Sequence, residues 1–318
     1  MSGGRHHHGQ STLRSAVVPK VRKPDAAYDL REILTEEIDL TSGKARKPFE
    51  SRKKARDEDR ARIKSLTAWL NLTRRVMQRR GSTAFRPADA RALRTKLNRQ
   101  LSLGPAPKTL ASLTFMRRFR RGFCGVVLRE LAAVPEEQIR LYTIVPPSWT
   151  FPADQLAAID PKALLDRFRA QLNRAGLARL SGWLIGFVHG DYDKTDDTFH
   201  VHLHALVVGD KAQAIEALRR LPTYRPTASV YHPIRQSKLK NPARQVSYHI
   251  AQGSWPSKPT LTIRGQTVRK RQRGRIDEPR HAEYLMWLDR QDFTDLVWLH
   301  NCQIRKGRLI VPPPSQAP

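Results

Sequence analysis

The stretch FHVHLHALVVGD, residues 199–210, decides the fold of this chain. It alternates His200, His202 and His204 with apolar residues. Because successive side chains of a β-strand point to opposite faces, the three imidazoles share one face, and Val201 and Leu203 point toward an apolar core on the other. Imidazole is the commonest metal ligand in proteins, so three of them on one face indicate a metal site.

The segment before it, GWLIGFVHGDYD at residues 182–193, predicts a second strand, and the turn-forming DKTDDT separates the two. If residues 184–192 and 199–208 pair as a symmetric antiparallel hairpin, His189 lies opposite His202 and Asp191 opposite His200. We therefore expect His202 and His204 to bind a divalent metal with His189 or Asp191, and His200 to be a further site residue. A carboxylate among the ligands favours Mg²⁺ or Mn²⁺ over Zn²⁺ when the substrate is a phosphate.

The charge of the chain predicts a polyanionic partner. The 318 residues include 58 Lys and Arg against 29 Asp and Glu, which gives a net charge of +29 and a pI near 11.0. Nucleic acid is the first choice, since Lys and Arg neutralise phosphates whatever the sequence, and no long apolar segment favours a membrane. The N-terminal MSGGRHHHGQ does not resemble a signal peptide, and Cys124 and Cys302 are the only cysteines. We expect a cytoplasmic protein.

Patterning predicts an α+β fold with a central antiparallel sheet, the His-x-His hairpin at its centre and helices on one face, flanked by N- and C-terminal helical extensions. We expect a mostly disordered basic segment over 1–57 and a helical basic region, a DNA-binding accessory, over 58–133. The sheet domain should span 134–276, with further strands at 139–147, 228–234 and 260–268 and helices at 212–221 and 242–252. A C-terminal helix over 277–303 and a tail over 304–318 should complete the chain.

Two arginine-rich stretches are candidate DNA contacts. FMRRFRRGF at residues 115–123 interleaves aromatic residues with arginines, as in surfaces that stack bases and bind phosphates. RGQTVRKRQRGR at residues 264–275 follows the last predicted strand of the domain. An ordinary amphipathic helix end and a solvated basic loop would have the same compositions. The candidate DNA-binding residues are Arg117, Arg118, Arg120, Arg121, Arg264, Arg269, Lys270, Arg271 and Arg273.

FHVHLHAL resembles the HUH motif of rolling-circle replication initiators, a His-hydrophobic-His pair on a central strand, here His202 and His204. An early strand, LYTIVPP, and a later helix with Tyr248 in VSYHIAQ also follow that family's order, so the resemblance covers residues 139–268. It implies a nickase of single-stranded DNA in which Mg²⁺ or Mn²⁺ polarises the scissile phosphate and Tyr248 attacks it, leaving a 5′-phosphotyrosine. It also implies single-stranded or hairpin DNA at the replication origin of a plasmid or similar element as the partner, with a host helicase or polymerase.

The chain departs from the family's Tyr-x-x-Lys motif, because Ala251 stands where the lysine is expected. Lys240, Arg244 or His249 would have to replace it. The same letters also fit the histidine-triad pattern, whose enzymes use the central histidine, here His202, as a nucleophile toward nucleotide phosphates. Charge and chain order favour the HUH resemblance over the triad, and a nucleic-acid-binding protein without catalysis is the third hypothesis.

Overall fold

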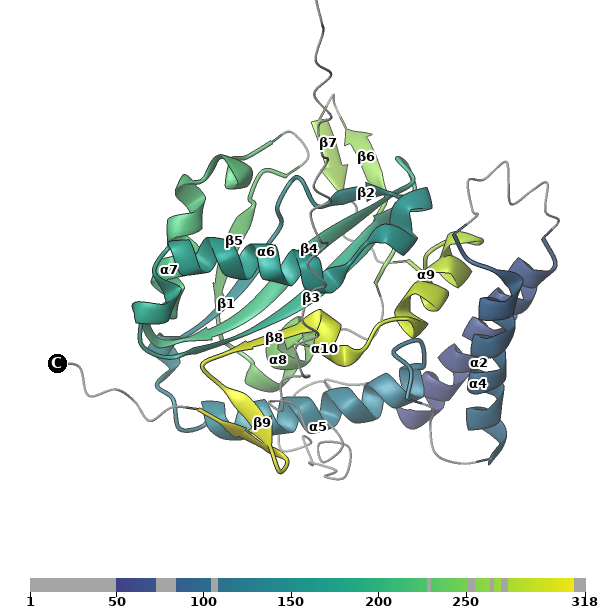
Figure 1. The fold of residues 1–318 in the computed structure, drawn as a ribbon, viewed down its shortest axis with the longest axis horizontal. Coiled ribbons are helices and arrows are strands. Elements are labelled where there is room, and N and C mark those ends of the chain that lie inside the picture. Colours follow the sequence, from purple (N-terminus) through teal and green to yellow (C-terminus); the bar gives the residue numbers. More distant parts are fainter. Residues whose placement is uncertain are drawn as a thin grey trace, which may run out of the picture.

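The fold of the chain is seen in a computed structural model, which describes residues 50–72, 84–103, 108–227, 230–250, 255–263, 266–269 and 274–311. A six-stranded sheet lies at its centre, with strand order β5-β1-β4-β3-β8 and β2 paired with the start of β4 (Figure 1). All neighbouring strands are antiparallel, so the predicted α+β class with the histidine hairpin at the centre of an antiparallel sheet is confirmed. The strands are β1 (Ile139–Ile144), β2 (Thr150–Pro152), β3 (Trp183–Asp193), β4 (Thr198–Val208), β5 (Ile234–Lys238) and β8 (Val297–His300).

The hairpin of β3 and β4 has the register that the sequence predicts. His189 pairs with His202 and Asp191 with His200. The turn is specified locally: the Asp193 carboxylate accepts a hydrogen bond from the Thr195 N–H (2.9 Å), and Asp197 adopts a left-handed conformation (φ 49°), which aspartate tolerates well. A slip of one residue in the pairing would turn apolar side chains away from the core. The cost of exposing them therefore favours the observed register.

Helices cover both faces of this sheet, whereas the sequence predicted them on one (Figure 1). α6 (Pro161–Arg174) and α7 (Ala212–Ala217) cover one face, and Phe168 of α6 contacts Trp298 of β8 with ring centroids 6.0 Å apart. α5 (Leu113–Leu131), α8 (Pro242–Ile250) and α10 (Phe293–Leu296) cover the other. We call this second face, which carries His189, His202 and His204, the histidine face. Phe123 of α5 packs there against Phe187 of β3 with centroids 5.5 Å apart.

Within the described residues, the predicted helical region contains α2 (Arg52–Leu70), α4 (Pro87–Leu103) and α5. α2 begins inside the segment expected to be mostly disordered, because the Ser51 hydroxyl accepts a hydrogen bond from the Lys54 N–H and caps the helix; residues 1–49 lie outside the described residues. The fully buried carboxylate of Asp59 accepts hydrogen bonds from the N–H groups of Leu113 and Thr114, at the start of α5. One continuous core therefore joins these helices to the sheet domain.

The C-terminal part differs most from the prediction. Helix α9 (Arg280–Asp289) is shorter than the expected helix over 277–303, and α10 and the edge strand β8 follow it. The apolar run at 296–299 fits either a helix or a strand by its periodicity, and pairing with the free edge of β3 decides the outcome. The expected tail contains a hairpin, β9 (Gln303–Arg305) and β10 (Arg308–Ile310).

Two strand predictions between 228 and 268 need correction. Of the strand expected over 228–234, residues 228 and 229 lie outside the described residues, and the described part enters a strand only at Ile234, because β5 pairs with β1 from there to Lys238. The single strand expected over 260–268 is a separate hairpin of β6 (Thr260–Ile263) and β7 (Gln266–Arg269). None of the helices among the described residues has the length and apolar character needed to span a membrane.

Candidate metal centre

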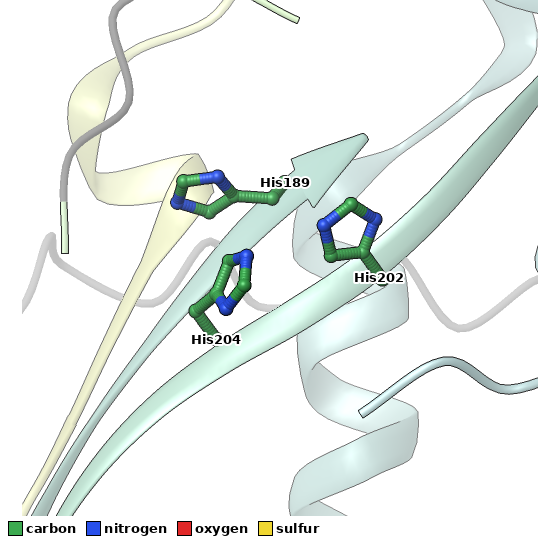
Figure 2. Close-up of side chains that lie close together, drawn as sticks. All are labelled: His189, His202 and His204. Carbon is green, nitrogen blue, oxygen red and sulfur yellow. The ribbon is translucent and has the colours of Figure 1, made fainter. Parts of the chain in front are cut away.

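Three imidazoles converge on the histidine face (Figure 2). His189 comes from β3, and His202 and His204 come from β4. One ring nitrogen from each lies within 4.8 Å of the others, and the side chains are 2%, 8% and 3% exposed. The ring centroid of His204 is 4.4 Å from that of His189 and 5.0 Å from that of His202. Three nitrogen donors at this separation, in a buried position, can hold one divalent metal ion.

His204 has the hydrogen bonding expected of a metal ligand. Its Nδ1 lies 3.1 Å from the Oγ1 of Thr143, the residue opposite it on β1, while its buried Nε2 has no hydrogen-bond partner among the described residues. Metal-ligating histidines usually donate their other N–H to a protein acceptor, which fixes the ring and the tautomer. Burial, and then the neighbouring His189 and His202, lower the pKa of His204 well below its ordinary value. The imidazole is therefore neutral and keeps a lone pair for a ligand.

Asp191 and His200 lie on the same face but outside the three-nitrogen group. The Asp191 carboxylate accepts a hydrogen bond from the Lys258 ammonium at 2.9 Å and forms an ion pair with it. His200 contacts the hydroxyl of Thr150 through Nδ1 (3.0 Å) and that of Thr198 through Nε2 (3.1 Å). Of the four ligands that the sequence predicts, the geometry thus brings together the three histidines.

Helix α8 places Tyr248 beside this group. The Tyr248 ring lies edge-on to His204 with centroids 5.6 Å apart, and the ring of His249 lies 4.6 Å from His204. Val246, which is fully buried, holds the helix in the core. Burial lowers the pKa of His249 to about 4, and its buried Nδ1 has no partner among the described residues. Ala251, which replaces the family's lysine, lies outside the described residues.

Two residues near the histidines were missed by the sequence analysis. Thr143 could have been found only from the pairing of β1 with β4, because a lone threonine in a strand carries no signal. Lys258 reaches the site from a segment that runs beside β3, where the Lys258 N–H donates to the Tyr192 carbonyl (2.8 Å). Its ammonium contributes a positive charge to the surroundings of His204.

The arginines expected to contact DNA have different environments. Arg117 and Arg120 are each 8% exposed, and they bind Glu50, Arg117 at the main-chain carbonyl and Arg120 at the carboxylate. Phe119 and Phe123, interleaved with them, are buried in the core, so base stacking by these two rings is excluded. Arg118 is exposed and Arg121 half-buried. Arg264, Lys270, Arg271, Arg273 and the side chain of Arg269 lie outside the described residues.

Comparisons of this chain with protein-family models, with curated protein sequences and with solved structures found no match.

Proposed function

We propose that this protein is a metal-dependent DNA endonuclease and strand transferase of the HUH type. In this proposal it nicks and rejoins single-stranded DNA through a 5′-phosphotyrosine and starts rolling-circle replication of a plasmid or similar element. One observation carries the proposal: a buried group of three histidines lies next to a tyrosine on the helix that covers it. The setting is the cytoplasm, with origin DNA as substrate and a host helicase or polymerase acting downstream.

The residues present fit a metal ion. His189, His202 and His204 would hold a divalent ion, with Thr143 fixing the ring of His204. Since the Asp191 carboxylate is not in this group, the HUH resemblance, and not the ligand set, favours Mg²⁺ or Mn²⁺. When bound, the ion supplies Lewis-acid polarisation of a non-bridging phosphate oxygen. Because the three ligands are neutral imidazoles, they leave the full charge of the ion available to the substrate phosphate.

Tyr248 is the proposed nucleophile. Its phenolic oxygen attacks the phosphorus, the bond from phosphorus to the 3′ oxygen breaks, and the new phosphotyrosine keeps the 5′ end while a 3′-hydroxyl leaves. The phenol must lose a proton in this step and the leaving oxygen must gain one. His249, whose ring centroid lies 5.3 Å from that of Tyr248, is the neighbouring group that we propose takes up the phenolic proton. The reverse sequence rejoins the strand without an external energy source.

Lys258 is the residue we propose in place of the missing lysine of Tyr-x-x-Lys. It lies ten residues beyond Tyr248 in the sequence, but its ammonium is on the histidine face, bound to Asp191 and partly exposed. A fixed cation there would attract the phosphate and offset charge that develops on it. The pair with Asp191 holds the ammonium in position when no DNA is bound.

The histidine-triad alternative receives less support. Both ring nitrogens of His200, the first histidine of that pattern, are hydrogen-bonded to threonines, and His200 is not a member of the three-nitrogen group. In the cluster that does form, the third member is His189 from the neighbouring strand.

The test is incubation of the full chain with a panel of single-stranded and hairpin oligonucleotides and Mn²⁺, followed by denaturing electrophoresis. We expect a covalent protein–DNA adduct that a chelator prevents. Release of nucleotides without an adduct would favour the histidine triad, and binding without any cleavage would favour a non-catalytic nucleic-acid-binding protein.

A further inference from the structure

A long basic stretch of the chain contributes several elements to the histidine face and its neighbourhood. Between Glu216 and Asp277 the sequence has 14 Lys and Arg and no Asp or Glu. This stretch contributes β5, α8, the segment with Lys258, and the hairpin of β6 and β7. A polyanion that reaches the histidines along this side meets no acidic residue of that stretch.

The sheet register places one of these cations in the same row as the metal site. Arg235 of β5 lies opposite Thr143 of β1, and Thr143 lies opposite His204 of β4. Residues directly opposite each other share a face, so Arg235 is on the histidine face. Neighbouring strands are about 4.8 Å apart, which puts the Arg235 backbone roughly 10 Å from that of His204.

Arg235 is available to a ligand. It is exposed and forms no ion pair or side-chain hydrogen bond within the described part of the chain. There, β5 pairs with β1 and has no strand on its other side, so the row ends at an open edge of the sheet. The guanidinium can therefore meet a phosphate that leaves the metal site in this direction.

An exposed aromatic ring lies just before this strand. Tyr231 is 74% exposed, the highest value among the exposed large hydrophobic residues, and the ring of His232 lies edge-on to it at 4.6 Å. The Val145 N–H, just beyond β1, donates to the Pro233 carbonyl (2.7 Å). This hydrogen bond fixes the backbone two residues after Tyr231. A solvated aromatic ring near an exposed cation is the kind of pair with which proteins stack the bases and bind the phosphates of single strands.

We infer that Arg235 and Tyr231 form a subsite for single-stranded DNA beside the metal centre, in which Arg235 binds a backbone phosphate and Tyr231 stacks on a base. The inference rests on the proposed function, because it names where the substrate strand would run. A duplex does not satisfy this subsite, since its bases are already stacked on each other and are not open to the ring.

Two matched pairs of variants test the subsite. Tyr231→Ala removes the ring, whereas Tyr231→Phe keeps it. Arg235→Gln removes a charge from the histidine face, and Lys238→Gln removes one from an exposed position of the same strand whose side chain points to the opposite face. The measurement is fluorescence anisotropy of an oligo-dT with a chelator present, at several salt concentrations, so that cleavage plays no part.

We expect Tyr231→Ala to weaken binding by about five- to hundredfold and Tyr231→Phe by less than about twofold, since stacking does not need the hydroxyl. Arg235→Gln should lower the slope of log affinity against log salt by about 0.7, the contribution of one phosphate of a single strand, and Lys238→Gln should leave it unchanged. Equal effects within either pair, or an equal loss of duplex binding, would overturn the subsite.

The Mn²⁺-dependent adduct of the unmodified protein, measured in parallel, separates this inference from the proposed function. If the adduct forms but the Tyr231 and Arg235 variants bind oligo-dT as tightly as the unmodified protein, the subsite is wrong and the proposed nickase stands. No affinity of the unmodified protein for oligo-dT, and no adduct with any oligonucleotide, removes both.

Discussion

The hydrogen bond between Thr143 and His204 offers a sharp test of the metal centre. The substitution Thr143→Val replaces a hydroxyl by a methyl group on the same β-branched side chain, so the strand and its packing should persist. It leaves the buried Nδ1 of His204, now 3.1 Å from the hydroxyl, without a partner. Loss of such a partner behind a ligand typically lowers metal affinity 10- to 100-fold, which corresponds to about 1.4–2.7 kcal/mol.

The matched control is Thr150→Val. Thr150 makes a bond of similar length (3.0 Å) to Nδ1 of His200, which lies outside the three-nitrogen group. Titration calorimetry with Mn²⁺ should show weaker binding, that is a larger dissociation constant, for Thr143→Val. The dissociation constant of Thr150→Val should be unchanged. Equal affinities for Thr143→Val and the unmodified protein, or an equal loss in both variants, would refute the assignment of His204 as a ligand held by Thr143.

The remaining predictions concern the histidines, the packing behind them and the response to pH. His202→Ala or His204→Ala should abolish Mn²⁺ binding and cleavage while changing DNA affinity, measured by anisotropy, by less than about twofold, since affinity comes mainly from phosphate contacts; full cleavage in chelator would contradict this. Gly190→Ala should lower the free energy of urea unfolding by about 1–3 kcal/mol, because the new Cβ would lie 2.6 Å from the Trp255 ring. The control, Gly186→Ala, places its Cβ 3.6 Å from the nearest atom and should lower the free energy of unfolding by less. Equal losses of stability in the two variants would count against this packing. Burial, and then the charges of Lys211 and Arg169, lower the pKa of His300 to about 4 from an ordinary 6.5, so the unfolded chain takes up the proton first and stability should fall as pH drops from about 6.5 toward 4. His300→Phe should remove this part of the decline, at most about 1.4 kcal/mol per pH unit for one proton and less for a half-exposed ring, as measured by urea unfolding at pH 5 and pH 7; an unchanged pH dependence would show that His300 titrates normally.

The hairpin could be predicted because two independent signals agreed. Alternating residues fixed the faces of both strands, and the short polar turn between them allowed one symmetric register, which placed His189 opposite His202. The same reasoning could not find β8. Its residues become a strand because β3 has a free edge beside them, a fact of tertiary pairing and not of the local pattern.

The candidate site also contains residues that the local sequence pattern predicts and residues that only tertiary pairing brings in. The three histidines lie on adjacent strands of one hairpin, so their meeting follows from local register. Thr143 and Lys258 enter through pairings with segments far away in the sequence, and the ion pair of Lys258 with Asp191 gives that carboxylate a role the spacing did not suggest. Arg117 and Arg120 show a further limit of the sequence pattern, because an arginine-rich helix has the same letters whether its side chains are free to meet DNA or are bound, as these two are, to Glu50.

The most direct test of the proposed nickase is to locate the residue that carries the DNA. The unmodified protein and Tyr248→Phe are incubated with the oligonucleotide that gives an adduct in Mn²⁺, resolved under denaturing conditions, and the adduct is digested for peptide mapping. We predict an adduct on the peptide that contains Tyr248 and none with Tyr248→Phe, which should keep its fold and its Mn²⁺ affinity because the phenol is not among the three nitrogen ligands. An adduct that survives in Tyr248→Phe, or that maps to another residue, would contradict the account.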